Sequence, residues 1–314
     1  MSHPFSATGK RFYPYSHYLK HRYGGRVAKV PLDGGFTCPN RDGAKSVGGC
    51  IYCSAHGSGD FIAHPSQSLP KQFQSYRQTL SQKWQPVGYI PYFQAFTGTY
   101  APPERLRELY TQALSLPQTV GLSIATRPDC LSDDVCAVLG TVAEQTDLTV
   151  ELGVQTVWDD TAARCNLCHT FSDVQDAICR LRRYPLQICV HLINGLPGEN
   201  AEQMISSART VGELGIDAIK LHLLHVLRGT ALAQQTSYRC MDKDEYISIV
   251  CSQLEVLPPS VVIQRLTGDG ARDDLLAPLW SLRKREVLNG IDQELKRRDS
   301  WQGKRLASES SPCT

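Results

Sequence analysis

Residues 26–53 read RVAKVPLDGGFTCPNRDGAKSVGGCIYC. The first six form a short apolar run with β-branched residues, which predicts a strand. The strand leads into a glycine-rich loop that carries Cys38, Cys50 and Cys53. Parallel βα barrels place their active sites at the carboxyl ends of their strands. The position of the loop therefore makes it the first candidate for chemistry.

Similar apolar runs recur along the chain, and segments with helical spacing lie between them. The predicted strands are 26–31, 89–95, 119–125, 148–154, 187–193, 216–223 and 261–266. The predicted helices are 69–84, 103–116, 132–145, 171–184, 201–214 and 242–257. Strands joined by single helices run parallel with right-handed crossovers, and continuous apolar strands suit a sheet covered by helices. No Gly-x-Gly-x-x-Gly fingerprint follows the first strand, so an α/β barrel is favoured over a doubly wound sheet.

Composition narrows the class of protein. The chain has 314 residues, 41% of them hydrophobic, and a net charge of +2. These values predict a globular protein with a sizeable core and exclude a disordered chain. No apolar run approaches the roughly 20 residues that span a bilayer, and the N-terminus does not resemble a signal peptide, so we expect a cytoplasmic protein. Isolated cysteines are expected to be reduced and packed in the core; they are Cys130, Cys136, Cys179, Cys189, Cys240 and Cys251.

Both ends of the chain are basic. Residues 1–32 contain six Lys/Arg, three His, six Phe/Tyr and no acidic residue. This mixture suits a phosphate backbone with bases to stack on, but it equally describes an arm whose rings pack on the barrel. Residues 283–305 carry eight Lys/Arg against four Asp/Glu, which on a terminal helix is typical of a solvated face.

The three clustered cysteines indicate a metal centre with an incomplete ligand shell. A structural zinc site requires four ligands, and His56 is the nearby fourth candidate. A [4Fe–4S] cluster held by Cys38, Cys50 and Cys53 leaves one iron open for a substrate or cofactor. Position at a strand end favours the open cluster, while a zinc site and unligated thiols remain alternatives.

Six segments, in order, resemble radical S-adenosylmethionine (SAM) enzymes of the YhcC/YtqA type, a branch related to the radical domain of the elongator catalytic subunit. The matching segments are 32–43, 92–97, 125–130, 150–156, 194–199 and 220–225. The resemblance implies a partial (β/α)6 TIM-type barrel over 26–270, with a basic aromatic arm over 1–25 and a helical extension over 271–314.

The resemblance also implies the cofactors. An open [4Fe–4S] cluster would bind SAM, and an electron from flavodoxin or ferredoxin would release a 5′-deoxyadenosyl radical that takes a hydrogen atom from the substrate. Cys38, Cys50 and Cys53 would bind the cluster, and Tyr52 would lie beside the adenine. The oligomeric state is left open.

Further SAM contacts carry over from the family by position. Thr97, Gly98 and Thr99 replace the Gly-Gly-Glu that holds the cofactor's amino group in many relatives. Gln155 would bond the ribose or carboxylate, and Arg164 would replace an arginine that the family has where this chain has Leu167. The turn flanking adenine is formed by Gly195, Pro197 and Gly198, although this pattern is also that of an ordinary turn. Cys165 and Cys168 are expected to pack at a helix start, with a second metal site as the alternative.

Charged and imidazole side chains complete the expected site. Arg127 and Glu151 are expected to end the third and fourth strands as catalytic, cofactor or substrate contacts, with a barrel-end salt bridge as the alternative. His222 and His225, together with Lys220, are expected to contact the substrate or donate protons.

Relatives of this type are implicated in maturing the aminomethyl side chain of the wobble uridine, so the resemblance implies a tRNA substrate whose base is splayed into the barrel mouth. Two alternatives remain: radical chemistry on a small metabolite or protein, and a zinc-stabilised nucleic-acid-binding module without catalysis.

Overall fold

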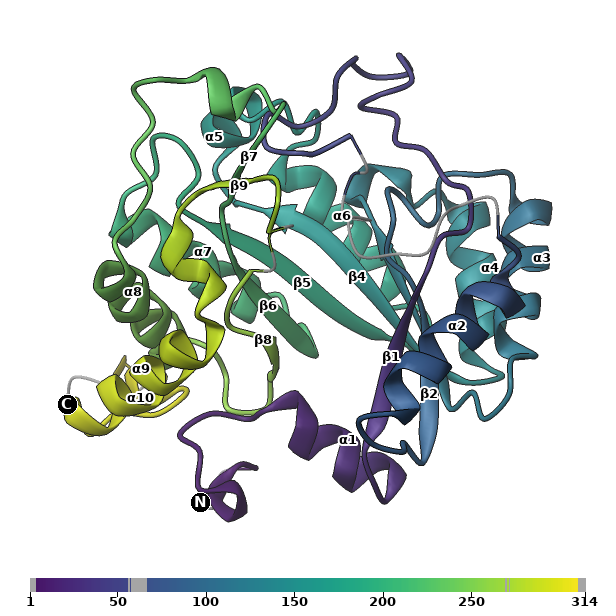
Figure 1. The fold of residues 1–314 in the computed structure, drawn as a ribbon, viewed down its shortest axis with the longest axis horizontal. Coiled ribbons are helices and arrows are strands. Elements are labelled where there is room, and N and C mark those ends of the chain that lie inside the picture. The colour runs from purple at the N-terminus through teal and green to yellow at the C-terminus, as the bar shows by residue number, and fades with distance from the viewer. Residues whose placement is uncertain (1–3, 56, 58–66, 269, 271, 310–314) are drawn as a thin grey trace.

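A computed structural model describes residues 4–55, 57, 67–268, 270 and 272–309. Seven parallel strands form one curved sheet in the order β1-β2-β3-β4-β5-β6-β8 (Figure 1). Their bounds are β1 Val27–Leu32, β2 Gly88–Phe93, β3 Gly121–Thr126, β4 Asp147–Gln155, β5 Gln187–Asn194, β6 Ala218–Leu223 and β8 Val262–Arg265. β1 and β8 are the edges of this sheet, so the barrel is open. The predicted partial barrel is confirmed.

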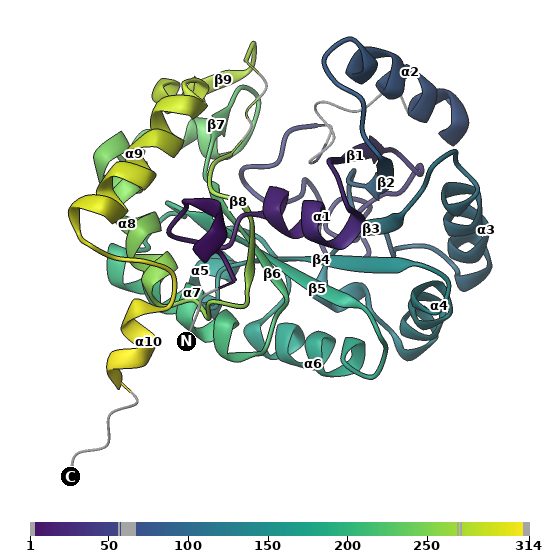
Figure 2. The ribbon, with the colours of Figure 1, turned by 90° about the horizontal axis from the view of Figure 1, so that it is seen from below.

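Helices cover the outer face of the sheet, as Figure 2 shows from below. The crossover helices are α2 Leu69–Ser81, α3 Pro103–Leu114, α4 Asp133–Ala143, α6 Phe171–Leu181, α7 Ala201–Glu213 and α8 Lys243–Glu255. Every predicted strand and helix is present, with each end within three residues of the prediction. The core lies between sheet and helices, where Phe73, Leu106 and Leu139 pack against strand residues such as Phe93 and Leu122. No helix among the described residues is long and apolar enough to cross a bilayer.

Helix α1 (Tyr15–Tyr23) lies across the amino ends of the strands, which we call the bottom of the barrel (Figure 2). Tyr15 and Tyr18 stack on each other and pack against strand residues at the bottom. Arg22 donates two hydrogen bonds to Asp147, of 2.9 and 2.6 Å. The arm is therefore packed on the barrel, as the second sequence interpretation expects, and it lies at the end opposite the Cys loop.

Several short or terminal elements escaped the sequence analysis. They are α5 Asp159–Arg164, β7 Val226–Leu227 and β9 Leu275–Ala277, with the 3-10 turns η1 Ser6–Thr8, η2 Pro128–Cys130, η3 Leu232–Gln234 and η4 Leu279–Leu282. The expected helical extension contains α9 Lys284–Arg297 and α10 Lys304–Glu309, and α9 buries Val287, Ile291 and Leu295. The domain division after residues 25 and 270 stays a prediction.

Candidate active site at the carboxyl ends of the strands

The loop after β1 folds back on itself and holds the three clustered cysteines. Backbone turns follow Cys38 and Cys50, because Arg41 N donates to Cys38 O at 2.8 Å and Cys53 N donates to Cys50 O at 3.0 Å. Gly49 has a φ of +81°, and a Cβ there would meet Arg41 Nε at 2.8 Å, so the fold of this loop requires glycine. All three cysteines are free and partly buried.

The segment after α5 holds the Cys loop in place. Asn166 Nδ2 donates to Gly49 O at 2.8 Å, and Asn166 O accepts from Asn40 Nδ2. Ile51 N donates to Cys165 O at 3.1 Å. The side chain of Cys165 is fully buried in an apolar cluster, which matches the packing expected from the sequence. Sequence reasoning missed the role of Asn166. The structure gives this residue a φ of +54°, which is uncommon for residues other than glycine.

Asn166→Gly should remove the side-chain bonds to the Cys loop while leaving the left-handed backbone unstrained. We expect a loss of about 1–3 kcal/mol in the free energy of unfolding, measured in urea, because Gly49 O loses a part-buried partner. Asn166→Ala should lose about 1 kcal/mol more, since alanine disfavours a positive φ. Wild-type stability in Asn166→Gly would show that the side-chain hydrogen bonds of Asn166 do not stabilise the Cys loop.

The thiol of Cys50 is prepared to ionise. The hydrogen bond with Cys53, together with Arg127 and the Asn40 amide, lowers the pKa of Cys50 to about 7 against the opposing effect of burial. The same bond raises the pKa of Cys53, so one proton is held between the two sulfurs. Asn40 Nδ2 lies 3.6 Å from Cys50 Sγ. A thiolate is the form that binds metals.

Arg127, just after β3, is held by two parallel hydrogen bonds to Asp129, both of 2.9 Å, and donates a third to Leu167 O at 2.7 Å. Lys45 reaches the same carboxylate at 2.7 Å. The structure thus contains the barrel-end salt bridge that the sequence left as an alternative, and its positive charge also acts on Cys50. Where the family has an arginine, the side chain of Leu167 is buried in apolar contacts.

The residues after β2 are largely occupied by the protein itself. Thr99 Oγ1 donates to Cys130 O at 2.7 Å and lies 2.5 Å from Thr126 Oγ1. The carbonyl of Gly98 accepts from Tyr110 at 2.7 Å. Thr97 is buried beside them, and its backbone N donates to Thr37 O at 3.3 Å. Their predicted contact with the amino group of SAM stays a prediction.

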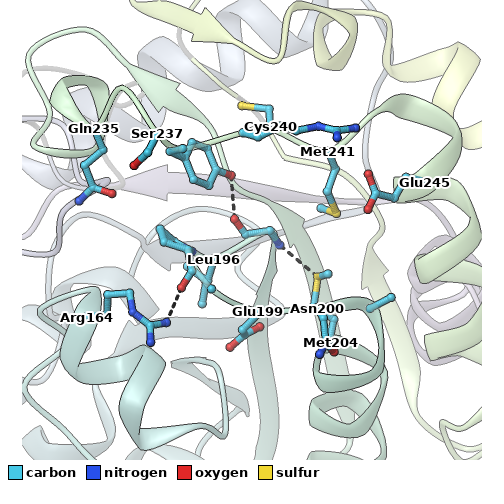
Figure 3. Close-up of a pocket in the computed structure, with 16 residues that line it drawn as sticks. Arg164, Leu196, Glu199, Asn200, Met204, Gln235, Ser237, Cys240, Met241 and Glu245 are labelled. Atoms are coloured by element: carbon cyan, nitrogen blue, oxygen red, sulfur yellow. Dashed lines mark hydrogen bonds between the residues drawn. The ribbon is translucent and has the colours of Figure 1, made fainter.

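Tyr52 and Leu196, in the turn at 195–198, belong to one apolar cluster, and the adenine site expected there stays a prediction. The turn also lines a cavity of about 470 Å³ (Figure 3). Arg164 lines this cavity and donates to Pro197 O at 2.7 Å. Arg164 therefore supports the turn. A Cβ at residue 198 would lie 2.2 Å from the Arg164 guanidinium, so the close approach of Arg164 requires glycine there.

A polar layer fills the interior of the barrel, which we call the lumen. Glu151 lies in the middle of β4, and its carboxylate accepts hydrogen bonds from side chains of four other strands. The donors are Lys29 on β1, Ser123 on β3, His191 on β5 and Lys220 on β6. Because Lys29 is three strands away from Glu151 in the sheet, their contact crosses the lumen.

The sequence analysis was therefore wrong on Glu151, which does not end its strand but sits below the mouth. Lys29, counted among the basic residues of 1–32, lies on β1 and reaches into the lumen. Lys220 is in the lumen as well, where its Nζ lies 3.4 Å from Tyr92 OH. Charged residues inside otherwise apolar strands could have predicted the polar layer, because barrel interiors are mostly filled by Val, Ile and Leu.

The two predicted histidines end up in different places. His222 stands next to the polar layer, with its ring 5.2 Å from the ring of His191, and its Nε2 has no hydrogen-bond partner among the described residues. His225 lies against the backbone of Gly268, where a Cβ would meet its ring at 2.5 Å. Gln155 ends β4 with a φ of +64° and a buried Oε1 that finds no partner in the described part of the chain.

Acid should weaken the fold through the buried histidines. Burial lowers the pKa of His191 and of His225 to about 4, so both side chains stay neutral in the folded chain. In the unfolded chain the same histidines take up protons below the ordinary histidine pKa of 6.5. Stability is therefore lost as pH falls from 6.5 toward 4. We expect a loss of about 2 kcal/mol for each histidine between pH 7 and pH 5, measured by urea unfolding. His225→Gln should remove about 2 kcal/mol of the acid-induced loss, while His191, His222 and His169, whose pKa values burial also lowers, keep the rest. His21→Gln on the exposed face of α1 should match wild type.

Comparisons with known proteins identify the family. The Radical_SAM C-terminal domain family matches residues 216–297. Over 314 residues the chain is 45% identical to YtqA of Bacillus subtilis, with 98% of each protein covered. The chain belongs to the YtqA/YhcC branch of the radical SAM enzymes. YhcC of Escherichia coli K12 is 36% identical over 266 residues, covering 83% of this chain and 85% of that protein.

More distant matches relate this radical SAM enzyme to larger proteins. A tRNA uridine(34) acetyltransferase of Dehalococcoides mccartyi is 33% identical over 156 residues, which cover 48% of this chain and 33% of that protein. The structure of Elp3 from Methanocaldococcus infernus has a TM-score of 0.67 with 16% identity over 88% of this chain, and the match spans 64% of that chain. At this identity the structural likeness shows the shared fold.

The family implies a [4Fe–4S] cluster and SAM, and the residues at the mouth fit both groups. The Cys loop offers soft thiol ligands, one of them with a lowered pKa, beside the cation Arg127. The hydroxyl of Tyr52 is buried beside the thiol of Cys50, and the ring packs in the same apolar cluster as Leu196. No three His, Cys, Asp or Glu in the described ranges converge on a single metal ion. The predicted zinc ligand His56 lies outside the described residues.

Proposed function

We propose that this radical SAM enzyme modifies the C5 side chain of the wobble uridine in tRNA, in the aminomethyluridine pathway. The observation that carries the tRNA part is the 33% identity, over 156 residues, to a protein named as a tRNA uridine(34) acetyltransferase. The fold also resembles that of Elp3. The cluster and SAM, when bound, would supply a 5′-deoxyadenosyl radical that takes a hydrogen atom from the substrate.

In this proposal each group at the mouth has a distinct task. Cys38, Cys50 and Cys53 hold the cluster, and Asn166 keeps their loop folded against the barrel. Tyr52 and the apolar turn around Leu196 hold the adenine. Arg127 stabilises negative charge near the thiolates, because its guanidinium is fixed by Asp129 and cannot turn away.

The rest of the barrel keeps water away from the reacting C–H bond. Helix α1 closes the bottom with Tyr15 and Tyr18, so substrate enters from the Cys-loop end. His222 and Gln155 place buried polar atoms without partners, among the described residues, along that entry. A splayed uridine would satisfy them by hydrogen bonding. Flavodoxin or ferredoxin is the proposed electron donor.

The experiment has two parts. The full chain is purified without oxygen, and its iron, sulfide and visible spectrum are compared with those of Cys50→Ala/Cys53→Ala. The control is Cys179→Ala, which removes a cysteine that is exposed rather than packed in the core as the sequence predicts. We expect a brown wild-type protein with about four irons, lost only in the double variant. In parallel, tRNA nucleosides are compared between a deletion strain and strains carrying each variant.

Each alternative predicts a different result. A colourless protein with one tightly held zinc would favour the nucleic-acid-binding module and overturn the radical chemistry. An iron–sulfur protein whose deletion changes no tRNA nucleoside would contradict the tRNA substrate and point to a metabolite or protein. Binding of tRNA should weaken steeply with salt, because phosphate contacts release counterions.

A further inference from the structure

We infer that the floor of the lumen, formed by Lys29, Glu151 and Lys220, binds an anionic group of the substrate, a carboxylate or a phosphate. The inference deepens the proposed function and rests on it in one respect only, which is that the barrel mouth is the active site. It names a chemical feature that the substrate must carry.

The charges of the floor do not balance. Lys29 Nζ and Lys220 Nζ each bind one oxygen of Glu151, which is the one carboxylate within ion-pair distance of either lysine among the described residues. His191 also donates to Glu151, at 2.8 Å, but it is neutral near pH 7 because burial lowers its pKa to about 4. Near pH 7 two ammonium groups therefore share one carboxylate, and one positive charge is in excess. Because burial lowers the pKa of Lys29 to about 8, this excess is lost as pH rises above 8.

Each lysine keeps a donor free for a ligand. Lys29 uses one N–H on Glu151 and another on Gln264 Oε1 at 3.4 Å. Lys220 uses one on Glu151 and another on Tyr92 OH at 3.4 Å. Both ammonium groups also lie over the ring of Tyr92, at 4.2 and 4.8 Å from its centroid. An ammonium group has three N–H donors, so one on each lysine has no hydrogen-bond partner among the described residues. An anion placed between them would accept both and would neutralise the excess charge.

The two lysines of the floor keep a small solvent-exposed surface. The side chains of Lys29 and Lys220 are 19% and 8% exposed, while Glu151 beneath them is fully covered. One step toward the mouth, Ala125 and Gly153 occupy the lumen-facing positions above Ser123 and Glu151 and are themselves partly exposed. Ala125 is small, whereas the place of a side chain at Gly153 is taken by Gln155, whose Nε2 would lie 2.7 Å from a Cβ there. Gln155 therefore lines the path from the mouth to the lysines.

Two orphaned atoms lie along the same path. His222 Nε2 and Gln155 Oε1 are buried and have no hydrogen-bond partner in the described part of the chain. His222 is two residues further toward the mouth than Lys220 on β6, and Gln155 is at the end of β4. Buried polar groups normally find partners, so these atoms point to a ligand that extends from the mouth to the floor.

Anion binding is tested on the anaerobically purified full chain, with thermal unfolding as the readout. Acetate and inorganic phosphate are titrated at constant ionic strength, using chloride as the reference. We expect saturable stabilisation of the wild type by one of the two probes at millimolar concentration. Tighter binding of acetate would identify a carboxylate as the recognised group, and tighter binding of phosphate would identify a nucleotide phosphate.

Lys29→Met and Lys220→Met should each bind the anion at least tenfold more weakly. Both variants should fold, because either change leaves one lysine matched to Glu151. Lys83→Met, at an exposed position after α2, is the matched control and should bind as wild type does. The inference would be overturned if neither acetate nor phosphate stabilised the wild type saturably, or if all three variants bound the anion equally well.

The outcome is separable from that of the proposed function. If both floor variants restore the tRNA nucleoside of the deletion strain as fully as wild type, the inference fails while the proposed function stands. If the anion binds as expected but deletion changes no tRNA nucleoside, the tRNA substrate is wrong and the lumen site stands for another substrate with an anionic group.

Discussion

Glu151→Gln is expected to lower the free energy of unfolding by about 3–5 kcal/mol, which is the usual cost of leaving a buried charge without its partner. The carboxylate is fully buried and carries the hydrogen bonds of Lys29, Lys220 and His191. An amide of the same shape keeps the volume but removes the carboxylate that offsets the two lysines. Urea unfolding at pH 7 measures the loss.

A double variant separates charge from packing. Glu151→Gln/Lys220→Met removes one cation together with the carboxylate, so it should recover about 1–3 kcal/mol relative to Glu151→Gln alone. Pairing Glu151→Gln with Lys83→Met, at an exposed position, should recover nothing. Equal stabilities of the single and the Lys220 double variant would mean that the charges of the floor are not coupled.

Arg127→Met is the second change with a large expected effect, about 3 kcal/mol of folding free energy. It removes the bidentate partner of Asp129, whose side chain is 3% exposed, and leaves Leu167 O without its donor. The loss should lie at the lower end of the range for a broken buried pair, because Lys45 still reaches Asp129. Urea unfolding of protein purified without oxygen measures it.

The matched control removes both members of the pair. Arg127→Met/Asp129→Leu should be more stable than Arg127→Met by about 1–2 kcal/mol, since the buried carboxylate of Asp129 is then no longer left without its arginine. The same protein samples test the electrostatic role of Arg127. If the guanidinium stabilises thiolates at the mouth, the iron content should fall in both variants, whereas a purely structural role would restore it in the double variant.

The strands and crossover helices could be predicted because their signal is local. Apolar β-branched runs separated by helical spacing leave few arrangements other than a parallel sheet covered by helices. The position of the Cys loop after β1 could be predicted for the same reason. Short elements such as β7 and β9 escaped because a two-residue or three-residue strand is specified by its tertiary partner rather than by its own sequence.

The basic arm shows where composition fails. Positive charge and aromatic rings in residues 1–32 are compatible with a nucleic-acid surface and with a packed plug, and composition does not distinguish them. The acidic partners lie far away in sequence: Arg22 pairs with Asp147, and Lys29 pairs with Glu151. The packing of α1 under the sheet brings Arg22 to Asp147, and the curvature of the sheet brings Lys29 to Glu151.

The sequence by itself determined the order of strands and helices, the cysteine loop and the family, because each is written in a contiguous stretch of chain. The tertiary structure alone decided which side chains meet in the lumen. Lys29, Glu151 and Lys220 are separated by 122 and 69 residues, and each looks like an isolated charge in an apolar strand. Curvature of the parallel sheet turns three distant strands toward one axis, and there their charges must satisfy one another because little water reaches them.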